Sequence, residues 1–496
     1  MNDNNTSAIV SKVWSFCNPL RDIGVGYGDY LEQLTYLLFL KMADEFSKPP
    51  YNRKLPIPKE YDWESLTAKR GDTLELHYTK LLSELSRQKG ILGQIFVQSQ
   101  NKIKEPAMLY KIIDMIDKEQ WATLGADIKG TIYEGLLEKN AEDTKSGAGQ
   151  YFTPRALIRA MVECVQPQPK KTIADPACGT GGFFLAAYDF IAKGNLDKDQ
   201  KQFLKFKTFF GNEIVANTRR MCLMNMFLHN IGDFDSENFI SPADALIATS
   251  PTTYDYVLAN PPFGRKSSMT ATNEEGEEET DELTYNRQDF WETSSNKQLN
   301  FVQHIRTMLK STGMAAVVVP DNVLFEGGAG ETVRKKLMET TELHTILRLP
   351  TGIFYKQGVK ANVFFFDNKV ASKEHWTKEI WFYDFRTNIH FTLKKNPLKL
   401  EDLRDFITCY NPNNRHKRKE LYNAETNPEG RWRKFSYDEI IARDKTSLDI
   451  SWIKDKSLTD LDNLPDPDVL ARDIIENLEA GLESFREIMI TINGKE

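Results

Sequence analysis

The chain has few cysteines, and their arrangement does not suggest a disulfide framework. Its five cysteines are scattered over 496 residues, odd in number and free of CxxC spacing. Small secreted domains that depend on disulfides normally carry an even number of regularly spaced cysteines. The pattern therefore indicates a reducing compartment, and we expect the protein to be cytoplasmic.

Several catalytic classes are excluded by motifs that are missing. No GxxxxGK[ST] loop occurs, so the chain by itself cannot drive translocation by ATP hydrolysis through a P-loop. The seven histidines form no HExxH or comparable set, and we expect no metal centre. A zinc finger, basic zipper or other independent base-reading module is not recognisable either. Any sequence recognition is therefore expected to be delegated to a partner.

Long hydrophobic runs and an excess of positive charge are also absent. The most apolar window, residues 34–43, contains Tyr36 and Lys41, and residues 1–5 have neither a basic region nor an apolar core. Neither export nor membrane insertion is expected. The net charge is −7, which is unfavourable for holding nucleic acid alone, because non-specific affinity comes mainly from Lys and Arg. Partner subunits could provide that charge.

Length and periodicity predict an α/β protein of two or three domains. The chain exceeds the ~250–300 residues at which single cores stop growing. Helical spacing predicts a helical domain over residues 1–143. Strand-like runs alternate with helices over residues 144–411, which predicts a Rossmann-like, doubly wound and mostly parallel sheet. Residues 412–496 are expected to form an extension that ends in a helix.

The most informative stretch is Asn260-Pro261-Pro262-Phe263, which follows an apolar run at residues 254–259. The Asn side chain and the carbonyl of Pro261 can accept hydrogen bonds from an exocyclic amino group, while Phe263 stacks on its ring. Two prolines fix φ and hold that carbonyl in place. The stretch suits methyl transfer to a planar nitrogen. A simple strand-ending turn is the alternative, since Asn-Pro is a common turn signal.

A strand, a small-residue loop and a helix follow one another at residues 172–175, 176–182 and 183–192. Such a loop lets backbone N–H groups approach a ligand, and Asp175 can accept hydrogen bonds from a cationic or hydroxyl-bearing cofactor. The spacing is not GxGxxG, and it fits an adenosyl group without a pyrophosphate better than a dinucleotide. The candidate cofactor-binding residues here are Asp175, Ala177, Gly179, Thr180, Gly181, Gly182 and Phe183.

Two further acids complete this set. Glu213 follows the strand-like residues 208–212, where a carboxylate can bind ribose hydroxyls. It lies 32 residues after Gly181 rather than the usual ~20, which we attribute to a polar insertion at residues 193–202. Asp244 can accept from the amino group of an adenine ring, although alone it is more typical of a helix N-cap.

The segment before the expected helix at residues 156–165 is a candidate anion site. Its backbone donors and one Thr hydroxyl can hold a carboxylate at a helix N-terminus. The candidate residues are Gln150, Tyr151, Phe152, Thr153, Pro154 and Arg155.

The order of these motifs resembles the amino-methyltransferases of the γ arrangement, and nearly the whole chain resembles the modification (M) subunit of type I restriction-modification systems. The further segments that carry this resemblance are residues 299–305, 319–325, 347–354, 436–440 and 447–452. One departure is Cys178, where a small apolar residue is common. The resemblance implies methylation of adenine N6 in a specific DNA sequence, with S-adenosylmethionine as the donor. It also implies double-stranded DNA with a flipped adenine, a specificity (S) subunit, a second M subunit and a restriction (R) subunit as partners.

Direct transfer from donor to base requires no covalent enzyme intermediate, so Cys178 need not act as a nucleophile. Other enzymes with an Asn-Pro-Pro-aromatic motif modify cytosine N4, rRNA guanine or a protein glutamine amide, and these remain alternatives. A scaffold that holds the specificity subunit without catalysis is another.

Three remaining segments carry weaker expectations. Residues 264–296 are polar and acidic, which favours a disordered loop over a flap that orders on DNA. The basic residues 415–419 are most often a solvated turn, with phosphate contact as the alternative. An apolar stripe predicts a C-terminal helix that packs on its own domain or on the specificity subunit. Its residues are Leu470, Ile474, Ile475, Leu478, Leu482, Phe485 and Met489.

Overall fold

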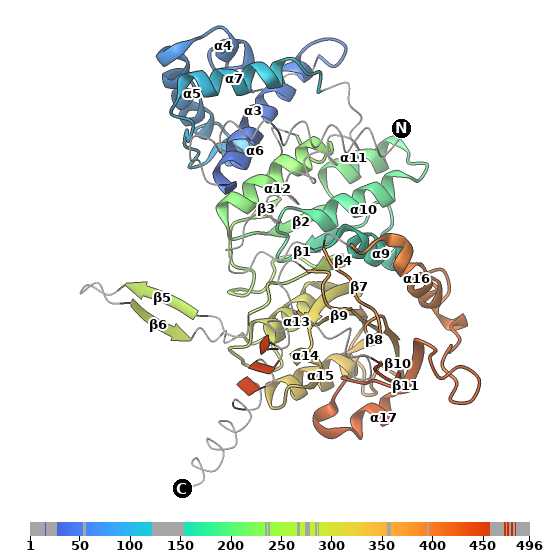
Figure 1. Cartoon of the computed structure of the whole chain (residues 1–496). Helices are drawn as coiled ribbons and strands as arrows, with labels where there is room; N and C mark the ends of the chain where they lie inside the picture. The colour runs from blue at the N-terminus through green and yellow to red at the C-terminus, as the bar shows by residue number, and fades with distance from the viewer. Residues whose placement is uncertain are drawn as a thin grey trace. The chain divides into compact units, whose positions relative to one another are not determined.

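The computed structural model divides into two compact units (Figure 1). It describes residues 15, 27–52, 56–121, 153–233, 236, 239–264, 268–272, 278–282, 285, 287–354, 359–393, 396–456, 471–472, 474–475, 478–479 and 482. The first unit comprises the described parts of Met1–Phe152 and Gln168–Asp244, and the second those of Thr153–Pro167 and Ala245–Glu496. The division at residues 143 and 411 expected from the sequence stays a prediction.

The N-terminal part of the first unit is helical, as the spacing of apolar residues predicts. Its helices are α3 (Tyr27–Ser47), η1 (Lys59–Tyr61), α4 (Trp63–Thr67), α5 (Gly71–Ser86), α6 (Gly90–Phe96) and α7 (Pro106–Asp117). Aromatic rings of α3 and α6 fill the core, with Tyr36 stacked 5.2 Å from Phe96. Within the described ranges, no helix combines the length and apolar character needed to cross a bilayer.

The rest of the first unit alternates strands and helices. Its elements are β1 (Ile173–Asp175), α10 (Gly182–Ala192), α11 (Lys198–Phe206), β2 (Phe209–Asn212), α12 (Ala216–Leu228) and β3 (Ile240–Ser241). β1 pairs in parallel with β2, and β2 with β3. The insertion expected at residues 193–202 leads into α11, where Asp197 and Gln200 form a capping box. This extra helix accounts for the long spacing between Gly181 and Glu213.

The second unit contains a mixed sheet. Its strands are β4 (Tyr254–Ala259), β7 (Leu309–Pro320), β8 (Thr341–Arg348), β9 (Ala361–Asn368), β10 (Glu379–Asp384) and β11 (Trp432–Ser436), in the order β11-β10-β8-β9-β7-β4. β4 is parallel to β7 and β8 to β10, but β9 runs antiparallel to both neighbours and β11 antiparallel to β10. The expectation of a mostly parallel sheet is therefore wrong for this unit. The next strand along the chain, β9, could lie parallel to β8 only after a long crossover, and no helix is present in the described residues between β8 and β9.

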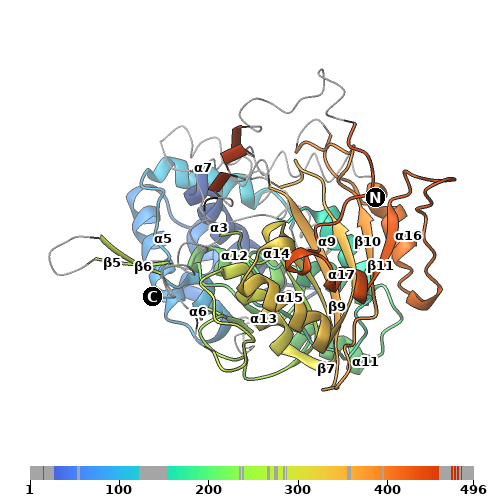
Figure 2. The same cartoon turned by 90° about the horizontal axis from the view of Figure 1, so that it is seen from below.

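Helices cover both faces of this sheet. The helices are α9 (Arg155–Val165), α13 (Lys297–Met308), α14 (Asn322–Phe325), α15 (Ala329–Thr340), η2 (Leu400–Leu403), α16 (Arg404–Tyr410), η3 (Arg415–Lys417), α17 (Tyr437–Ile441) and η4 (Asp444–Thr446). Figure 2 shows α13 and α15 on one side of the strands and α9 and α16 on the other. β4 and β7 are thereby buried on both faces, which explains their continuous apolar runs.

Two segments complete the second unit. β5 (Ser268–Thr272) and β6 (Glu278–Glu282) pair as an antiparallel hairpin, so the expected disordered loop is wrong for these residues. Polar composition argues against a core, but it does not prevent Thr-containing strands from pairing locally. The described residues between 471 and 482 are helical, as predicted. Their apolar side chains are exposed: Ile474, Ile475, Leu478 and Leu482.

Candidate functional site

Asn260 follows directly after β4, at the carboxyl end of a strand, as the sequence predicts. Its Nδ2 donates to Oγ1 of Thr153 at 2.8 Å. Its Oδ1 is buried and has no hydrogen-bond partner among the residues that the structure describes. Since a buried amide oxygen without a donor is costly, this atom is an acceptor that a ligand can satisfy.

The three residues after Asn260 have no helical or strand structure. Pro261 is buried, and Pro262 and Phe263 are partly exposed. The Phe263 ring meets Phe354 edge to face, with centroids 5.9 Å apart and planes at 71°. This contact holds one edge of the Phe263 ring.

Thr153 and Pro154 precede helix α9, which begins at Arg155, one residue earlier than predicted. Thr153 is only 9% exposed. The other predicted residues of this segment, Gln150, Tyr151 and Phe152, lie outside the described residues. Of this candidate anion site, the structure therefore places the Thr hydroxyl and the helix N-terminus.

The small-residue loop between β1 and α10 has the backbone geometry that its glycines permit. Gly179 and Gly181 have φ of +55° and +83°, in the left-handed region that favours glycine. Asp175 is buried at the end of β1, and its Oδ1 accepts from the N–H of Ala177 at 2.9 Å. Thr180 and Gly182 are partly exposed, whereas the side chain of Phe183 is buried in α10.

Glu213 lies against the loop between β1 and α10. The sequence predicts both as cofactor-binding elements but does not predict that they contact each other. Its Oε2 accepts from the N–H of Gly179 at 3.1 Å and its Oε1 from that of Val215 at 2.7 Å. Each carboxylate oxygen keeps a further lone pair, so the group can still accept from ligand hydroxyls.

Asp244 lies three residues after the end of β3 and directly after Ala243, which is held by a hydrogen bond to β2. The side chain of Asn212 donates to the carbonyl of Ala243 at 3.2 Å. A turn rather than a helix follows at residues 245–248, so the N-cap alternative for Asp244 is wrong.

The carboxyl groups of Asp175 and Glu213 have raised pKa values, which suits a ligand that donates hydrogen bonds. Burial raises the pKa of Asp175 to about 8, with Glu213 adding to this and the Ala177 N–H opposing it. Burial likewise raises the pKa of Glu213, against the N–H groups of Val215 and Gly179. An ammonium group or hydroxyls at this position would stabilise the ionised forms, as expected for a cationic ligand that carries a ribose.

The thiol of Cys178 is unsuited to nucleophilic chemistry. It is buried beside Cys222, and burial followed by the hydrogen bond to Cys222 raises its pKa well above the usual value. The thiolate is the reactive form, so this cysteine is expected to stay inert. Among the described residues, no cluster of His, Cys, Asp or Glu is arranged to hold a metal ion.

Comparison with known protein families shows which family contains these motifs. Residues 124–452, more than half of the chain, match the model of the N-6 DNA methylases. The chain belongs to the N-6 DNA methylase family. Residues 9–116 also match the model of the HsdM N-terminal domain.

Individual relatives of this methylase are type I enzymes. The type I restriction enzyme StySJI methylase subunit of Salmonella typhimurium is 38% identical, with 98% of this chain and 95% of the relative aligned. The crystal structure of the EcoKI M protein is 34% identical, covers 98% of this chain and 96% of its own, and has a TM-score of 0.53. A chain from a structural study of type I complex assembly is 25% identical, covers 99% of both chains and has a TM-score of 0.71. The resemblance to type I methylase subunits and the α/β methyltransferase fold are thereby confirmed.

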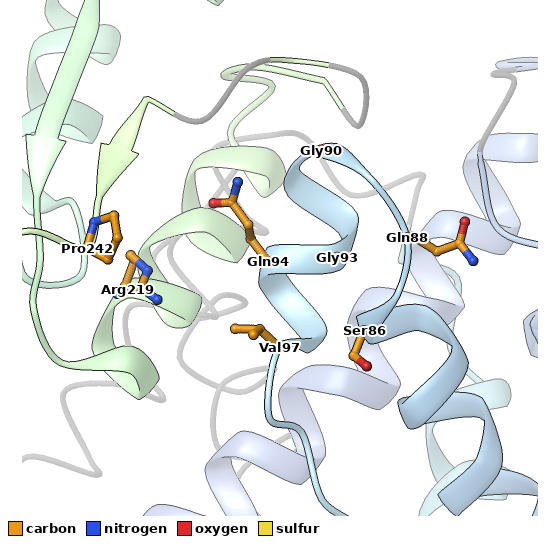
Figure 3. A pocket seen from close by; sticks show the side chains of 8 residues that line it. All are labelled: Ser86, Gln88, Gly90, Gly93, Gln94, Val97, Arg219 and Pro242. Atoms are coloured by element: carbon orange, nitrogen blue, oxygen red, sulfur yellow. The ribbon is translucent and has the colours of Figure 1, made fainter.

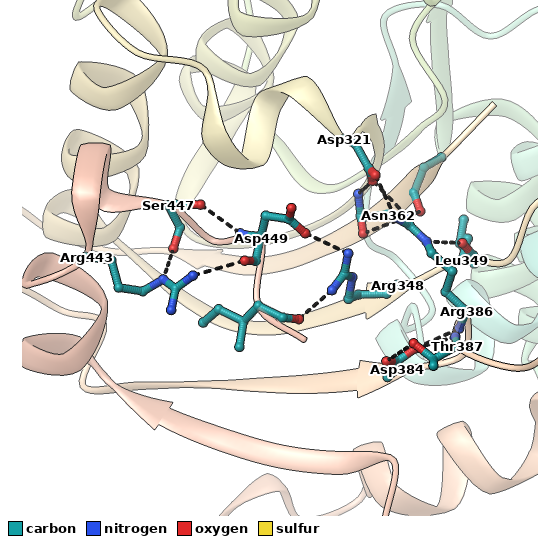
Figure 4. Close-up of polar contacts among 12 residues, drawn as sticks. Asp321, Arg348, Leu349, Asn362, Asp384, Arg386, Thr387, Arg443, Ser447 and Asp449 are labelled. Atoms are coloured by element: carbon teal, nitrogen blue, oxygen red, sulfur yellow. Dashed lines mark hydrogen bonds and ion pairs between the residues drawn. The ribbon is translucent and has the colours of Figure 1, made fainter. Parts of the chain in front are cut away.

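Three of the segments that carried the type I resemblance, residues 319–325, 347–354 and 447–452, take part in polar contacts of the second unit (Figure 4). Arg386 forms a bidentate pair with Asp321 at 2.6 and 2.8 Å, and Asn362 donates to the same carboxylate. Arg348, at the end of β8, pairs with Asp449 at 2.7 Å and donates to the carbonyl of Ile450. Burial alone would raise the pKa of Asp321, but Arg386 holds it below the ordinary value. This methylase therefore uses these segments to fasten residues 447–450 to the sheet.

The basic residues 415–419 are only partly a solvated turn. Arg415 pairs with Asp367, and Arg418 donates to the carbonyl of Tyr410 at 2.6 Å and to Thr345 at 3.0 Å. His416, Lys417 and Lys419 are exposed. Arg415 and Arg418 therefore bond to other residues of this chain, which weakens the alternative that they contact phosphate groups.

The first unit also contains a hollow of about 470 Å³, and none of the predicted site residues that the structure describes lines it (Figure 3). Arg219 and Pro242 face Gln94 and Val97 of α6 across it. Arg219 donates to the backbone carbonyl of Glu213 at 3.2 Å, and it is the one charged side chain among the lining residues. Through this bond, one side chain that lines the hollow holds the backbone of Glu213.

Sequence reasoning missed three side chains. Ile214 and Val215 follow Glu213 and are 59% and 42% exposed, an apolar surface next to the acid. Phe354 supports Phe263. Two sequence features could have indicated them. Ile214 and Val215 are an apolar pair directly after the acid that ends a strand, and Phe354 is the aromatic residue that ends residues 347–354.

Proposed function

We propose that this chain transfers a methyl group from S-adenosylmethionine to N6 of adenine in a specific DNA sequence, as the modification subunit of a type I restriction-modification complex. The family supports this, and one observation carries it: the buried, unsatisfied Oδ1 of Asn260 at the start of an Asn-Pro-Pro-Phe stretch. An exocyclic amino group supplies the hydrogen that this oxygen lacks.

In the proposed mechanism, the target adenine must first leave the duplex. Its N6 is otherwise held in the base stack, and extrusion costs a few kcal/mol. Phe263, braced by Phe354, offers a ring on which the flipped base can stack. The stacking aligns the base and excludes water from one of its faces.

Asn260 and Pro261 then act on the amino group. Oδ1 of Asn260 and the carbonyl of Pro261 accept hydrogen bonds from the two N–H groups of N6, which draws the nitrogen lone pair out of conjugation with the ring. Both acceptors also stabilise the positive charge that develops on N6 during transfer. S-adenosylmethionine, when bound, supplies a methyl group that is already activated for direct displacement. Alignment is the main contribution required of the protein, and no covalent enzyme intermediate is formed.

For the donor, we assign Glu213 to the ribose hydroxyls, Asp175 to the ammonium group and Asp244 to the adenine amino group. Gly179 and Gly181 let the backbone approach the ligand, and Ile214 offers an apolar face to the adenine ring. The Thr153 hydroxyl and the N-terminus of α9 are assigned to the carboxylate. Buried acids with raised pKa values and an exposed apolar side chain fit this cationic, partly apolar donor.

We expect Glu213→Ala to weaken donor binding by about 1–3 kcal/mol, because bidentate acceptors for the ribose hydroxyls are lost. Calorimetry with the methyl donor measures the change. Glu213→Gln is the matched control, since it keeps the side-chain shape and one acceptor oxygen, and its loss should be smaller. Thermal unfolding checks that the loop held through Gly179 is intact. Unchanged donor affinity in a folded Ala variant would remove Glu213 from the site.

Donor binding is expected to strengthen as pH rises from 6 to 8 and to level off above. The pKa of Asp175 is about 8 before the donor binds, so below that pH the carboxyl is mostly protonated and must lose its proton to pair with an ammonium group. The affinity then changes by up to about tenfold per pH unit. Calorimetry in buffers of different ionisation enthalpy should show proton release, and Asp175→Asn should weaken both effects and leave only the share of Glu213, whose pKa is raised by burial as well. A flat affinity between pH 6 and 8 would contradict the assignment.

We infer the partners from the net charge of the chain and from its exposed apolar side chains. A net charge of −7 and the lack of a recognisable base-reading module support delegation of sequence recognition to a specificity subunit. The exposed apolar side chains of Ile474, Ile475, Leu478 and Leu482 support a helical contact with that subunit. A second copy of this chain and a restriction subunit complete the proposed assembly on double-stranded DNA.

One experiment tests the reaction against its alternatives. DNA from cells that express this chain with its neighbouring genes is read by long-read detection of modified bases. N6-methyladenine in one defined sequence is the expected result. N4-methylcytosine would instead favour the cytosine enzymes, and unmodified DNA combined with no donor binding would favour a scaffold.

A further inference from the structure

The hydrogen bond between Thr153 and Asn260 joins two motifs that are 107 residues apart. We propose that Thr153 is a positioning residue: its hydroxyl accepts from Nδ2 of Asn260 while donating to the carboxylate of the methyl donor, which fixes the amide with Oδ1 free for the target amino group. This inference rests on the proposed function, and it adds a link between donor binding and base recognition.

The side-chain amide of Asn260 has two chemically different ends. One end of the Asn260 side chain donates and the other accepts, and a half-turn about the last bond exchanges them. Only the orientation with Oδ1 outward can bind a base amino group, because the opposite one would set two donors against each other. In the structure Nδ2 donates to Thr153, and Oδ1 is buried with no hydrogen-bond partner within the described part of the chain.

A Thr hydroxyl has one donor and two acceptor lone pairs. If its proton were free, it could hold either end of the amide and would not select between them. A carboxylate accepts only, so a carboxylate that takes this proton leaves the hydroxyl oxygen solely as an acceptor. It can then bind Nδ2 and not Oδ1. Thr153 directly precedes Pro154 and α9, whose N-terminal N–H groups favour an anion.

Burial makes this selection effective. Thr153 is 9% exposed, and Oδ1 of Asn260 is shielded, so water competes poorly for either group. The expected consequence is reciprocal coupling: the donor's carboxylate strengthens binding of a flipped adenine, and the flipped adenine strengthens donor binding by the same factor.

The test uses the complex with its specificity subunit and a duplex that carries the target found by modified-base sequencing. Thr153→Val removes the hydroxyl at nearly constant shape, Thr153→Ala removes it without adding bulk, and Thr153→Ser retains it. We expect kcat to fall about tenfold to a hundredfold in Val and Ala while KM for DNA stays within about threefold. Ser should remain within about threefold of wild type.

Two binding readouts separate positioning from simple structural support. A duplex with hypoxanthine at the target position presents a carbonyl instead of an amino group, so the preference for adenine over hypoxanthine should narrow in Val and Ala but not in Ser. S-adenosylhomocysteine, which keeps the carboxylate, should strengthen binding of the adenine duplex to wild type several-fold, and its decarboxylated analogue should not.

Wild-type kcat in a folded Val or Ala variant, or an unchanged base preference in both, would overturn the role of Thr153. Equal coupling by the two donor analogues would overturn the carboxylate link. Failure of the proposed function looks different: the wild-type complex itself would leave no N6-methyladenine in the duplex.

Discussion

Asn260→Ala is expected to abolish methylation while the chain still binds the methyl donor. Removing one preorganised polar contact to a charge that develops in the transition state typically costs on the order of 10²–10³ in kcat. Here the lost Oδ1 is the acceptor assigned to N6, and the Pro261 carbonyl alone cannot orient the amino group. The loss should appear in kcat and kcat/KM alike, since the contact acts on the reacting nitrogen.

The measurement combines methyl transfer by the complex with calorimetry of donor binding. Asn413→Ala is the matched control, because Asn413 is exposed and its side chain accepts a hydrogen bond from the side chain of Gln166 at 3.1 Å, away from Asn260 in the sequence. It should retain full activity. Near wild-type methylation by Asn260→Ala would remove Asn260 from the catalytic role, and loss of donor binding would mean that the substitution acts on the fold instead.

The purified chain alone is expected to methylate DNA poorly and without site preference, and to gain sequence-specific activity with a specificity subunit. Each mismatched base pair in a specific site typically costs ~1–3 kcal/mol, and that discrimination must come from contacts to base edges. The chain has no recognisable module for such contacts, and its net charge of −7 works against phosphate binding. Full-rate methylation of one sequence by the chain alone would contradict the prediction.

Truncation before Asp466 should separate the chain from the specificity subunit and leave donor binding intact. The cut removes the exposed apolar residues of the C-terminal helix. Ile474→Gln with Leu478→Gln in the full chain tests the same surface without a deletion. Leu76→Gln is the control, as Leu76 is 66% exposed on α5 and outside this helix. Co-purification measures assembly, and a complex that survives both the truncation and the double substitution would exclude this helix as the contact.

The sequence by itself determined the local elements and the chemical types of the site. Residues 254–259 form β4 as predicted, and the loop after β1 begins α10 within one residue of its predicted start. These features depend on neighbouring residues: apolar runs, glycines that adopt positive φ, and prolines that fix φ. The placing of Asp175, Glu213 and Asn260 at strand ends was likewise readable from pattern.

Only the tertiary structure decided which groups meet and what their surroundings do to them. The bonds from Asn260 to Thr153, from Gly179 to Glu213 and from Arg348 to Asp449 join residues far apart in the chain. The antiparallel course of β9 and the pairing of β5 with β6 depend on partner strands that composition does not reveal. The raised pKa of Asp175 arises from burial. Burial and long-range hydrogen bonds are properties of the packed chain, because topology and not neighbouring sequence sets which surfaces exclude water.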